Sequence, residues 1–226
     1  MRMTSLCVLC LVLFGACNSL KYTTQSQKVL PELGTIGLFK DFVLQQSYEE
    51  KGVVSIKEPV RLQWELQNVQ KRQLFQKKDS IKKRIDSVLI AINILDQMNL
   101  IGQINDDKNT IEYLKKAEDH QIVTGTTIHF PNEVLGHFKM ADEAYLVQNK
   151  VSTLSIELRK DNEPVQTIEF TDGTITDIQT SAFCWGQNRK RKIVVFDLTP
   201  PNESCNDDTY RSAKKAKKKH EFHIFK

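Results

Sequence analysis

The sequence predicts an α+β fold, in which an antiparallel β-meander of about four to six strands is covered by a long helix and one or two shorter helices. Three observations support this class. In the second half of the chain, apolar and polar residues alternate, which is the period of a half-buried strand. Short turn-forming segments separate these stretches, as between antiparallel neighbours. In the first half, apolar residues recur every three or four positions, which is the period of a helix.

The first half of the chain is dominated by one expected helix. Residues 38–44 fit either a strand or a short helix, and residues 53–56 fit a strand that Pro59 would end. No Gly or Pro occurs from residue 60 to residue 100, and the apolar positions there are Leu62, Leu66, Val69, Ile81, Ile85, Val88, Ile92 and Leu95. This spacing predicts a helix of roughly 40 residues, or two helices broken near residues 79–80. A shorter helix is expected at residues 109–118.

The second half is expected to form the sheet. A strand is predicted at residues 122–130, followed by a helix over residues 131–149 that starts with a proline in its first turn. Four successive strands are then predicted at residues 151–159, 165–170, 174–180 and 192–198. The polar turns at residues 160–163 and 171–173 make neighbouring strands antiparallel.

These patterns divide the chain into five segments. They are a signal peptide (1–16), a flexible tether (17–30), a mixed segment dominated by the long helix (31–120), an antiparallel sheet domain (121–205) and a basic tail (206–226). The polar composition of residues 18–28 is typical of a tether.

The N-terminus has the features of an export signal. One arginine near the start is followed by an apolar or small run from residue 6 to residue 16. Eleven helical residues span about 16 Å, roughly half of a hydrocarbon core, so we do not expect a permanent transmembrane helix. No later stretch is apolar for long enough to span a membrane, so we expect a soluble or lipid-anchored mature protein.

The residues at the end of this signal, LFGAC at positions 13–17, resemble the lipobox of bacterial lipoproteins. The resemblance implies that Cys17 is lipidated and becomes the N-terminus of a membrane-anchored envelope protein, periplasmic or surface-facing. The alternative is an ordinary signal peptide cut near Ala16 or Ser19, which would give a secreted, non-lipidated protein. The resemblance covers only the first 17 residues.

The five cysteines fall into separate groups under this interpretation. Cys7 and Cys10 leave with the signal, and Cys17 carries lipid. Cys184 and Cys205 remain as an even pair in a chain that enters an oxidising compartment, which favours a disulfide. It would close a loop of about 20 residues, worth on the order of 3 kcal/mol. The alternative is two unpaired thiols.

The basic character of the chain is concentrated at its end. Residues 211–226 carry a formal charge of +6 and the rest of the chain carries −2. The lysines expected to contact an anionic surface are Lys214, Lys215, Lys217, Lys218 and Lys219. Anionic lipid, a cell-wall polymer or an envelope protein are the expected partners, and export argues against intracellular nucleic acid. The alternative is a solvated, solubilising tail.

Candidate catalytic chemistry is sparse. Glu133 and His137 lie four residues apart on an expected helix, with His129 just before it, and could form part of a zinc site. A plain Glu–His surface pair is the simpler interpretation. No cofactor is expected. The sequence therefore favours a binding or scaffolding protein over the alternative of a small metal-dependent envelope hydrolase.

Overall fold

The computed structural model describes residues 30–42, 45–69, 87–150, 153–206 and 208–223. Within these ranges the chain forms ten β-strands, four α-helices and a short 3-10 helix. All strand pairings are antiparallel, which confirms the α+β class. The signal peptide, Cys17 and nearly all of the tether lie outside the described residues. None of the described helices combines the length and the apolar content needed to cross a membrane.

The elements follow one another mostly as strands. In chain order they are β1 (Thr35–Phe42), β2 (Gln45–Val53), β3 (Val60–Val69), β4 (Ser87–Ile94), α2 (Gln97–Asp106), α3 (Lys108–Leu114), β5 (Gln121–His129), α4 (Asn132–Met140), β6 (Glu143–Lys150), β7 (Thr153–Lys160), β8 (Glu163–Glu169), η1 (Phe170–Asp172), β9 (Thr174–Gln187), β10 (Ile193–Thr199) and α5 (Ala213–His223).

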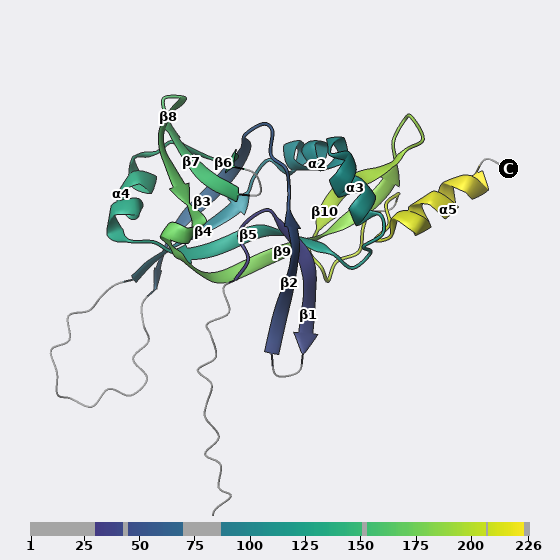
Figure 1. Cartoon of the computed structure of the whole chain (residues 1–226), viewed down its shortest axis with the longest axis horizontal. Helices are drawn as coiled ribbons and strands as arrows, with labels where there is room; N and C mark the ends of the chain where they lie inside the picture. The colour runs from purple at the N-terminus through teal and green to yellow at the C-terminus, as the bar shows by residue number, and fades with distance from the viewer. Residues whose placement is uncertain (1–29, 43–44, 70–86, 151–152, 207, 224–226) are drawn as a thin grey trace, which may run out of the picture.

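One large sheet organises the molecule. Its strand order is β10-β9-β5-β4-β3-β6-β7-β8, and β1 joins it by pairing with β5 and with β2. The β1–β2 hairpin projects from the sheet, α4 lies at the end formed by β6 to β8, and α5 lies at the opposite end beside β9 and β10 (Figure 1). Thus α4 and α5 are placed at the ends of the sheet, and α2 packs on β10 and β3, so no single layer of helices covers the sheet.

The hydrophobic core lies against one face of this sheet. Alternate residues of β3 to β7 point into it, as shown by Leu62, Ile92 and Ile156, which are all at most 2% exposed. The opposite face carries the alternating polar residues. The two faces follow directly from the period-two pattern of each strand.

The predicted long helix over residues 60–100 is wrong. Residues 60–69 form β3 and residues 87–94 form β4, paired from Leu62 with Ile94 to Val69 with Ser87. Residues 70–86 lie outside the described part of the chain. A spacing of four residues satisfies both a helix and a strand, because it is also two strand repeats. The β-branched and aromatic residues at alternate positions decide for strand.

Three further expectations need correction. Residues 141–149 do not continue a helix from Pro131, because α4 ends at Met140 and β6 begins at Glu143. Residues 54–56 do not form a strand, although Val54 and Ile56 are buried in the core. The shorter helix expected at residues 109–118 is α3, which begins earlier because Asp107 caps it by accepting a hydrogen bond from the backbone of Asn109.

The predicted second-half strands and the disulfide are confirmed. Strands β5, β7, β8, β9 and β10 coincide with the five stretches of alternating residues, and β9 runs on to Gln187. The bond between Cys184 and Cys205 joins β9 to the segment that follows β10. Beyond it, Tyr210 forms a backbone bridge with Trp185 that leads the chain into α5.

Candidate functional site

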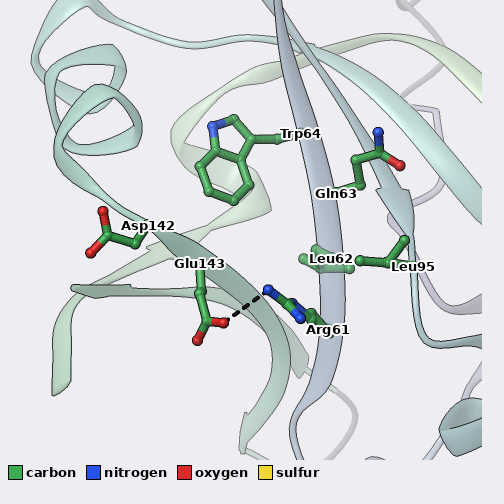
Figure 2. Close-up of a pocket in the computed structure, with 7 residues that line it drawn as sticks. All are labelled: Arg61, Leu62, Gln63, Trp64, Leu95, Asp142 and Glu143. Atoms are coloured by element: carbon green, nitrogen blue, oxygen red, sulfur yellow. Dashed lines mark ion pairs between the residues drawn. The ribbon is translucent and has the colours of Figure 1, made fainter. Parts of the chain in front are cut away.

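A hollow opens where β3 and β6 diverge. The two strands pair only from Val60 with Leu146 to Leu62 with Ala144, after which they separate. The space between them measures about 170 Å³, and Figure 2 shows the side chains around it. They are Arg61, Leu62, Gln63, Trp64, Leu95, Asp142 and Glu143. The fork therefore gathers an indole ring, two carboxylates, an amide and a guanidinium group.

The aromatic wall of the hollow is held by a helix. Trp64 packs on Phe138 of α4, with ring centroids 6.2 Å apart and planes inclined at 57°. Phe138 is itself 1% exposed and packs on Phe130, so its position is fixed by the core. Trp64 is only half-buried and lines the hollow. Its ring thus presents a fixed apolar surface to solvent.

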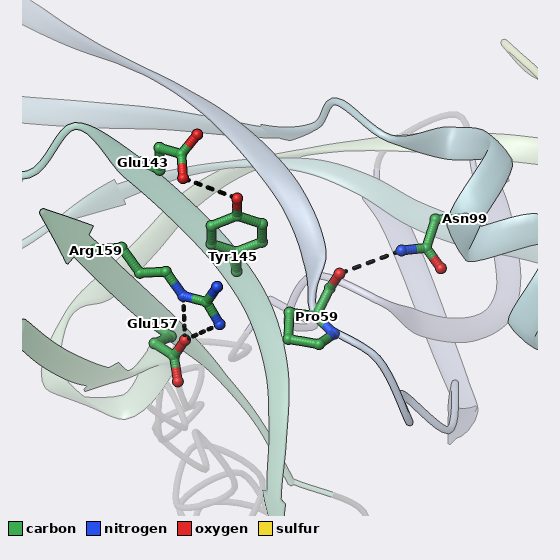
Figure 3. A network of polar contacts seen from close by, with 6 residues as sticks. All are labelled: Pro59, Asn99, Glu143, Tyr145, Glu157 and Arg159. Atoms are coloured by element: carbon green, nitrogen blue, oxygen red, sulfur yellow. Dashed lines mark hydrogen bonds and ion pairs between the residues drawn. The ribbon is translucent and has the colours of Figure 1, made fainter. Parts of the chain in front are cut away.

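A network of charged side chains continues from the hollow across β6 and β7 (Figure 3). Both carboxylate oxygens of Glu143 are engaged, because Arg61 Nη2 lies 2.9 Å from Oε1 and the Tyr145 hydroxyl donates to Oε2 at 2.9 Å. Burial and this hydrogen bond to Glu143 raise the pKa of Tyr145. The guanidinium of Arg159 lies 4.4 Å from the centre of the Tyr145 ring and also binds Glu157.

The strand register produces this arrangement. Arg61 is opposite Tyr145, Glu143 is opposite Arg159, and Tyr145 is opposite Glu157. All five side chains therefore lie on the polar face of the sheet, as direct or diagonal cross-strand neighbours. Their charges offset one another. The network holds the side chains beside the hollow in one arrangement, which favours recognition of a ligand without reorganisation.

Asp142 makes fewer polar contacts than Glu143. Its Oδ2 accepts a hydrogen bond from the backbone of Asp161 at 3.2 Å, and the residue is exposed. With Arg61 and Glu143 paired, the lining of the hollow carries one net negative charge, on Asp142. The hollow therefore offers a hydrogen-bond acceptor beside an aromatic ring.

The predicted lysines lie on α5 and point to solvent. Ala213 and Ala216 are 7% and 0% exposed, so the helix rests on the domain through its alanines. The five lysines at positions 214, 215 and 217–219 are all exposed. One end of the helix is attached through Glu118, which accepts a hydrogen bond from Ser212 at 3.0 Å and lies 3.3 Å from Lys214. These two contacts lower the pKa of Glu118.

The predicted metal candidates do not gather into a site. Glu133 and His137 lie on α4, and His129 is exposed at the end of β5. Within the part of the chain that the structure describes, no three His, Cys, Asp or Glu side chains stand together as a metal would need. The three residues are close in sequence, but the structure does not bring them together as a set of metal ligands.

The residues of the hollow were missed from the sequence. The sequence pattern predicts helices for the segments that contain Arg61 and Trp64 and, further on, Asp142 and Glu143, so it does not predict their cross-strand proximity. The signal that could have found them is the strict alternation of residues 60–67, apolar at even and polar at odd positions.

The comparisons with known proteins give no relative. No protein-family model matches this chain, and no curated protein or solved structure shows significant similarity to it. Any functional proposal therefore rests on this chain's own residues.

Proposed function

We propose that this chain is an exported, membrane-anchored envelope lipoprotein with a binding role, and that the lysines of α5 contact an anionic partner. The anchor is the lipid on Cys17, and the domain follows the tether on the periplasmic or surface side. No catalytic step is part of the proposal.

The observation that carries the binding role is the two-sided composition of α5. Its buried side consists of alanines, and its exposed side of lysines. A solubilising tail needs no docked helix, whereas here the Trp185–Tyr210 bridge, the Cys184–Cys205 bond and the contacts of Glu118 hold the basic helix in place. Each basic residue close to an anionic surface contributes about 1 kcal/mol, which salt screens.

The export part of the proposal is supported by two independent features. The charged start and short apolar run at residues 1–16 are typical of a signal peptide. The disulfide between Cys184 and Cys205 is of a kind that persists in oxidising compartments and is rare in the cytosol.

Substitution of the proposed lipid-bearing cysteine tests the anchor. Cys17→Ala, expressed in a bacterial host, should move the protein from the membrane fraction to the soluble fraction, and metabolic labelling with palmitate should be lost. Cys7→Ala, inside the signal, is the matched control and should leave both unchanged. Membrane partitioning that survives Cys17→Ala would favour the secreted, non-lipidated alternative.

Charge removal on α5 tests the anionic partner. In the Cys17→Ala background, changing Lys215, Lys218 and Lys219 to glutamine should lower the salt concentration at which the protein elutes from a heparin column. The control changes Lys57, Lys139 and Lys160 to glutamine, which removes the same net charge from exposed positions elsewhere. Equal shifts for both triple variants would show that net charge, rather than α5, governs retention.

A further inference from the structure

A second cluster of basic residues lies at the tip of the hairpin that joins β9 to β10. Arg189, Lys190, Arg191 and Lys192 follow one another there, and all four are exposed. Within the part of the chain that the structure describes, none of them pairs with a carboxylate. The turn therefore carries four like charges that no ion pair offsets.

The backbone of this turn is fixed by hydrogen bonds of its own. The Asn188 amide donates to the carbonyl oxygen of Lys192 at 3.0 Å, and the Arg191 amide donates to that of Asn188 at 2.8 Å. The side-chain oxygen of Asn188 accepts from the backbone amides of Lys190 and Lys192, each at 3.0 Å. Gln187 donates to the carbonyl oxygen of Arg191 at 3.1 Å. The tip therefore holds its shape without a partner, so binding does not have to order it.

Arg191 occupies a position in this turn that favours glycine or asparagine. Its φ of 60° lies in the left-handed region, where a long side chain strains the backbone. Hairpin turns with a residue in this conformation commonly have glycine there. Strained residues of this kind cluster at functional sites. The chain thus carries a basic side chain where the geometry of the turn alone would favour a smaller residue.

The hairpin tip and α5 lie at the same end of the molecule (Figure 1). The last residue of β9 that pairs with β5 is Ala182, and beyond it Tyr210 pairs with Trp185 through two backbone hydrogen bonds of 2.7 and 2.8 Å. Helix α5 begins shortly after, at Ala213, and contacts both β9 and β10. The two basic clusters, which are separate in the sequence, are therefore carried by one end of the sheet.

The acidic residues at this end do not neutralise the two clusters. The tip and α5 present nine exposed Lys and Arg side chains, four on the tip and five on the helix. Glu118 lies 3.3 Å from Lys214 and offsets that one charge. Glu203 and Asp208, in the loop between β10 and α5, are exposed and offset part of the rest. The basic groups remain in excess, so this end attracts a polyanionic surface.

We propose that this end of the molecule, the hairpin tip at residues 188–192 together with α5, binds an anionic lipid bilayer. The inference rests on the anionic partner proposed above for α5, and it adds the second element and the kind of partner. Both elements project outward from the sheet, so a broad flat surface can contact them at the same time (Figure 1). Clusters of about four to eight Lys and Arg residues are typical of segments that bind anionic lipid.

The proposed lipid on Cys17 would keep such a surface within reach of the domain. The fourteen residues from 17 to 30 can span at most about 50 Å when fully extended. A lipid anchor and a basic surface reinforce each other, because binding of one raises the local concentration of the bilayer for the other. A domain bound through α5 and the tip would hold the opposite end of the sheet, formed by β6 to β8, away from the membrane.

Binding to vesicles tests the inference directly. The Cys17→Ala protein, which lacks the anchor, is mixed with vesicles of phosphatidylcholine alone or of equal parts of phosphatidylcholine and phosphatidylglycerol. Sedimentation then measures the bound fraction. The protein should bind only the anionic vesicles, and rising salt should release it, because salt screens the attraction.

Charge removal at each element locates the contact. Changing Arg189, Lys190 and Lys192 to glutamine should weaken vesicle binding by about tenfold or more, because each basic residue near an anionic bilayer contributes about fivefold. The triple glutamine variant of α5 described above should weaken it to a similar extent. The control triple variant, which removes the same net charge elsewhere, should change affinity by less than about threefold. Circular dichroism of each variant verifies folding.

Three results would overturn the inference. The first is equal binding to neutral and anionic vesicles. The second is a tip variant that binds anionic vesicles no more weakly than the control variant does. The third is no binding to anionic vesicles, and persistent retention on heparin would then assign this end to a soluble or wall-bound polyanion. In the last two cases an effect of the α5 lysines on heparin retention would still support the proposed function, so the two can fail separately.

Discussion

The side-chain amide of Asn105 pairs with both backbone groups of Val195, as a neighbouring strand would. Its Nδ2 donates to the carbonyl oxygen at 2.8 Å and its Oδ1 accepts from the amide nitrogen at 2.9 Å. Val195 lies at the irregularity in the pairing of β10 with β9, on a strand that ends the sheet. A residue of α2 thus covers the edge of β10, where unpaired backbone would invite association.

Asn105→Ala should therefore destabilise the domain and expose this edge. We expect the free energy of unfolding to fall by about 1–2 kcal/mol, because two backbone groups lose their partner. Chemical denaturation measures the loss, and hydrogen exchange should accelerate at the amide of Val195. Asn109→Ala, on the exposed surface of α3, serves as the control. An unchanged exchange rate at Val195 would contradict the role given to Asn105.

Tyr48 joins the projecting hairpin to the sheet, and its removal should be costly. Its hydroxyl donates to the carbonyl oxygens of Thr35 at 3.1 Å and Gln121 at 3.2 Å, and the residue is 8% exposed. Tyr48→Phe should lower the free energy of unfolding by about 1–2 kcal/mol, because the two carbonyl groups lose the single hydroxyl proton that they share. Thermal denaturation at neutral pH measures the effect, and the control is Tyr113→Phe, which removes an exposed hydroxyl bonded to the side chain of His120.

The same hydroxyl predicts an alkaline dependence of stability. Burial, with the nearby charge of Glu50, raises the pKa of Tyr48 well above its usual value of 10.0. The folded state therefore keeps the proton that the unfolded state loses above about pH 10, so this stabilisation declines as the pH rises further. The stability difference between wild type and Tyr48→Phe should shrink above pH 10. A difference that stays constant from pH 8 to pH 11 would argue against a buried, protonated hydroxyl.

Removal of the disulfide should destabilise the C-terminal end first. The bond joins residues separated by 21 positions, and the double variant Cys184→Ala/Cys205→Ala should lose about 3 kcal/mol of stability. Limited proteolysis should then cut residues 200–212 before the sheet unfolds. The single variant Cys205→Ala tests whether a free thiol at buried Cys184 adds to the effect. Equal protease resistance of the double variant and wild type would refute the docking role.

Gly34 occupies a position that no side chain fits. Its φ of 82° lies in the left-handed region, and a Cβ atom there would stand 2.6 Å from Cδ1 of Leu154. Gly34→Ala should therefore destabilise by about 1–3 kcal/mol, through backbone strain and crowding of the core. Gly52→Ala in β2, where a Cβ meets nothing within 4 Å, is the control. Comparable melting temperatures for both variants would contradict this reasoning.

The second half of the fold could be read from the sequence because its signals are local. Alternation over residues 122–130 and 151–170, with polar turns between the later strands, depends only on near neighbours. The disulfide could be predicted from the number of cysteines, because Cys184 and Cys205 are the pair that remains once the cysteines of the signal and Cys17 are set aside. Both kinds of signal can be recognised in the sequence without knowledge of tertiary contacts.

The sequence pattern of the first half wrongly predicts a helix, because its apolar residues satisfy two periods. Leu62 and Leu66, like Val88 and Ile92, stand four apart, which suits one face of a helix and one face of a strand equally well. The intermediate Trp64 and Ile90 favour the strand, and in the structure those strands are buried between neighbours that supply their hydrogen bonds. The pairing of these strands with their neighbours determines their structure, because local propensity favours neither helix nor strand.

The proximity of Asn93 and Gln179 across β5 could not be predicted from the sequence for a different reason. Asn93 and Gln179 come together only because β5 inserts between β4 and β9 in a particular register. Register is a property of pairs of strands, and nothing within β4 or β9 alone specifies it. The lysines of α5 could be predicted because a cluster of charged residues is evident in the sequence itself.

The position of β5 also governs how the chain reaches its native state. This strand pairs with β1, β4 and β9, so its hydrogen bonds are complete only when segments from both halves of the chain have arrived. Contacts between distant segments form slowly, because loop closure costs entropy before the contacts stabilise anything. We therefore expect the pairing of β9 with β5 to form late in folding, and the edge of this central strand to stay open until then.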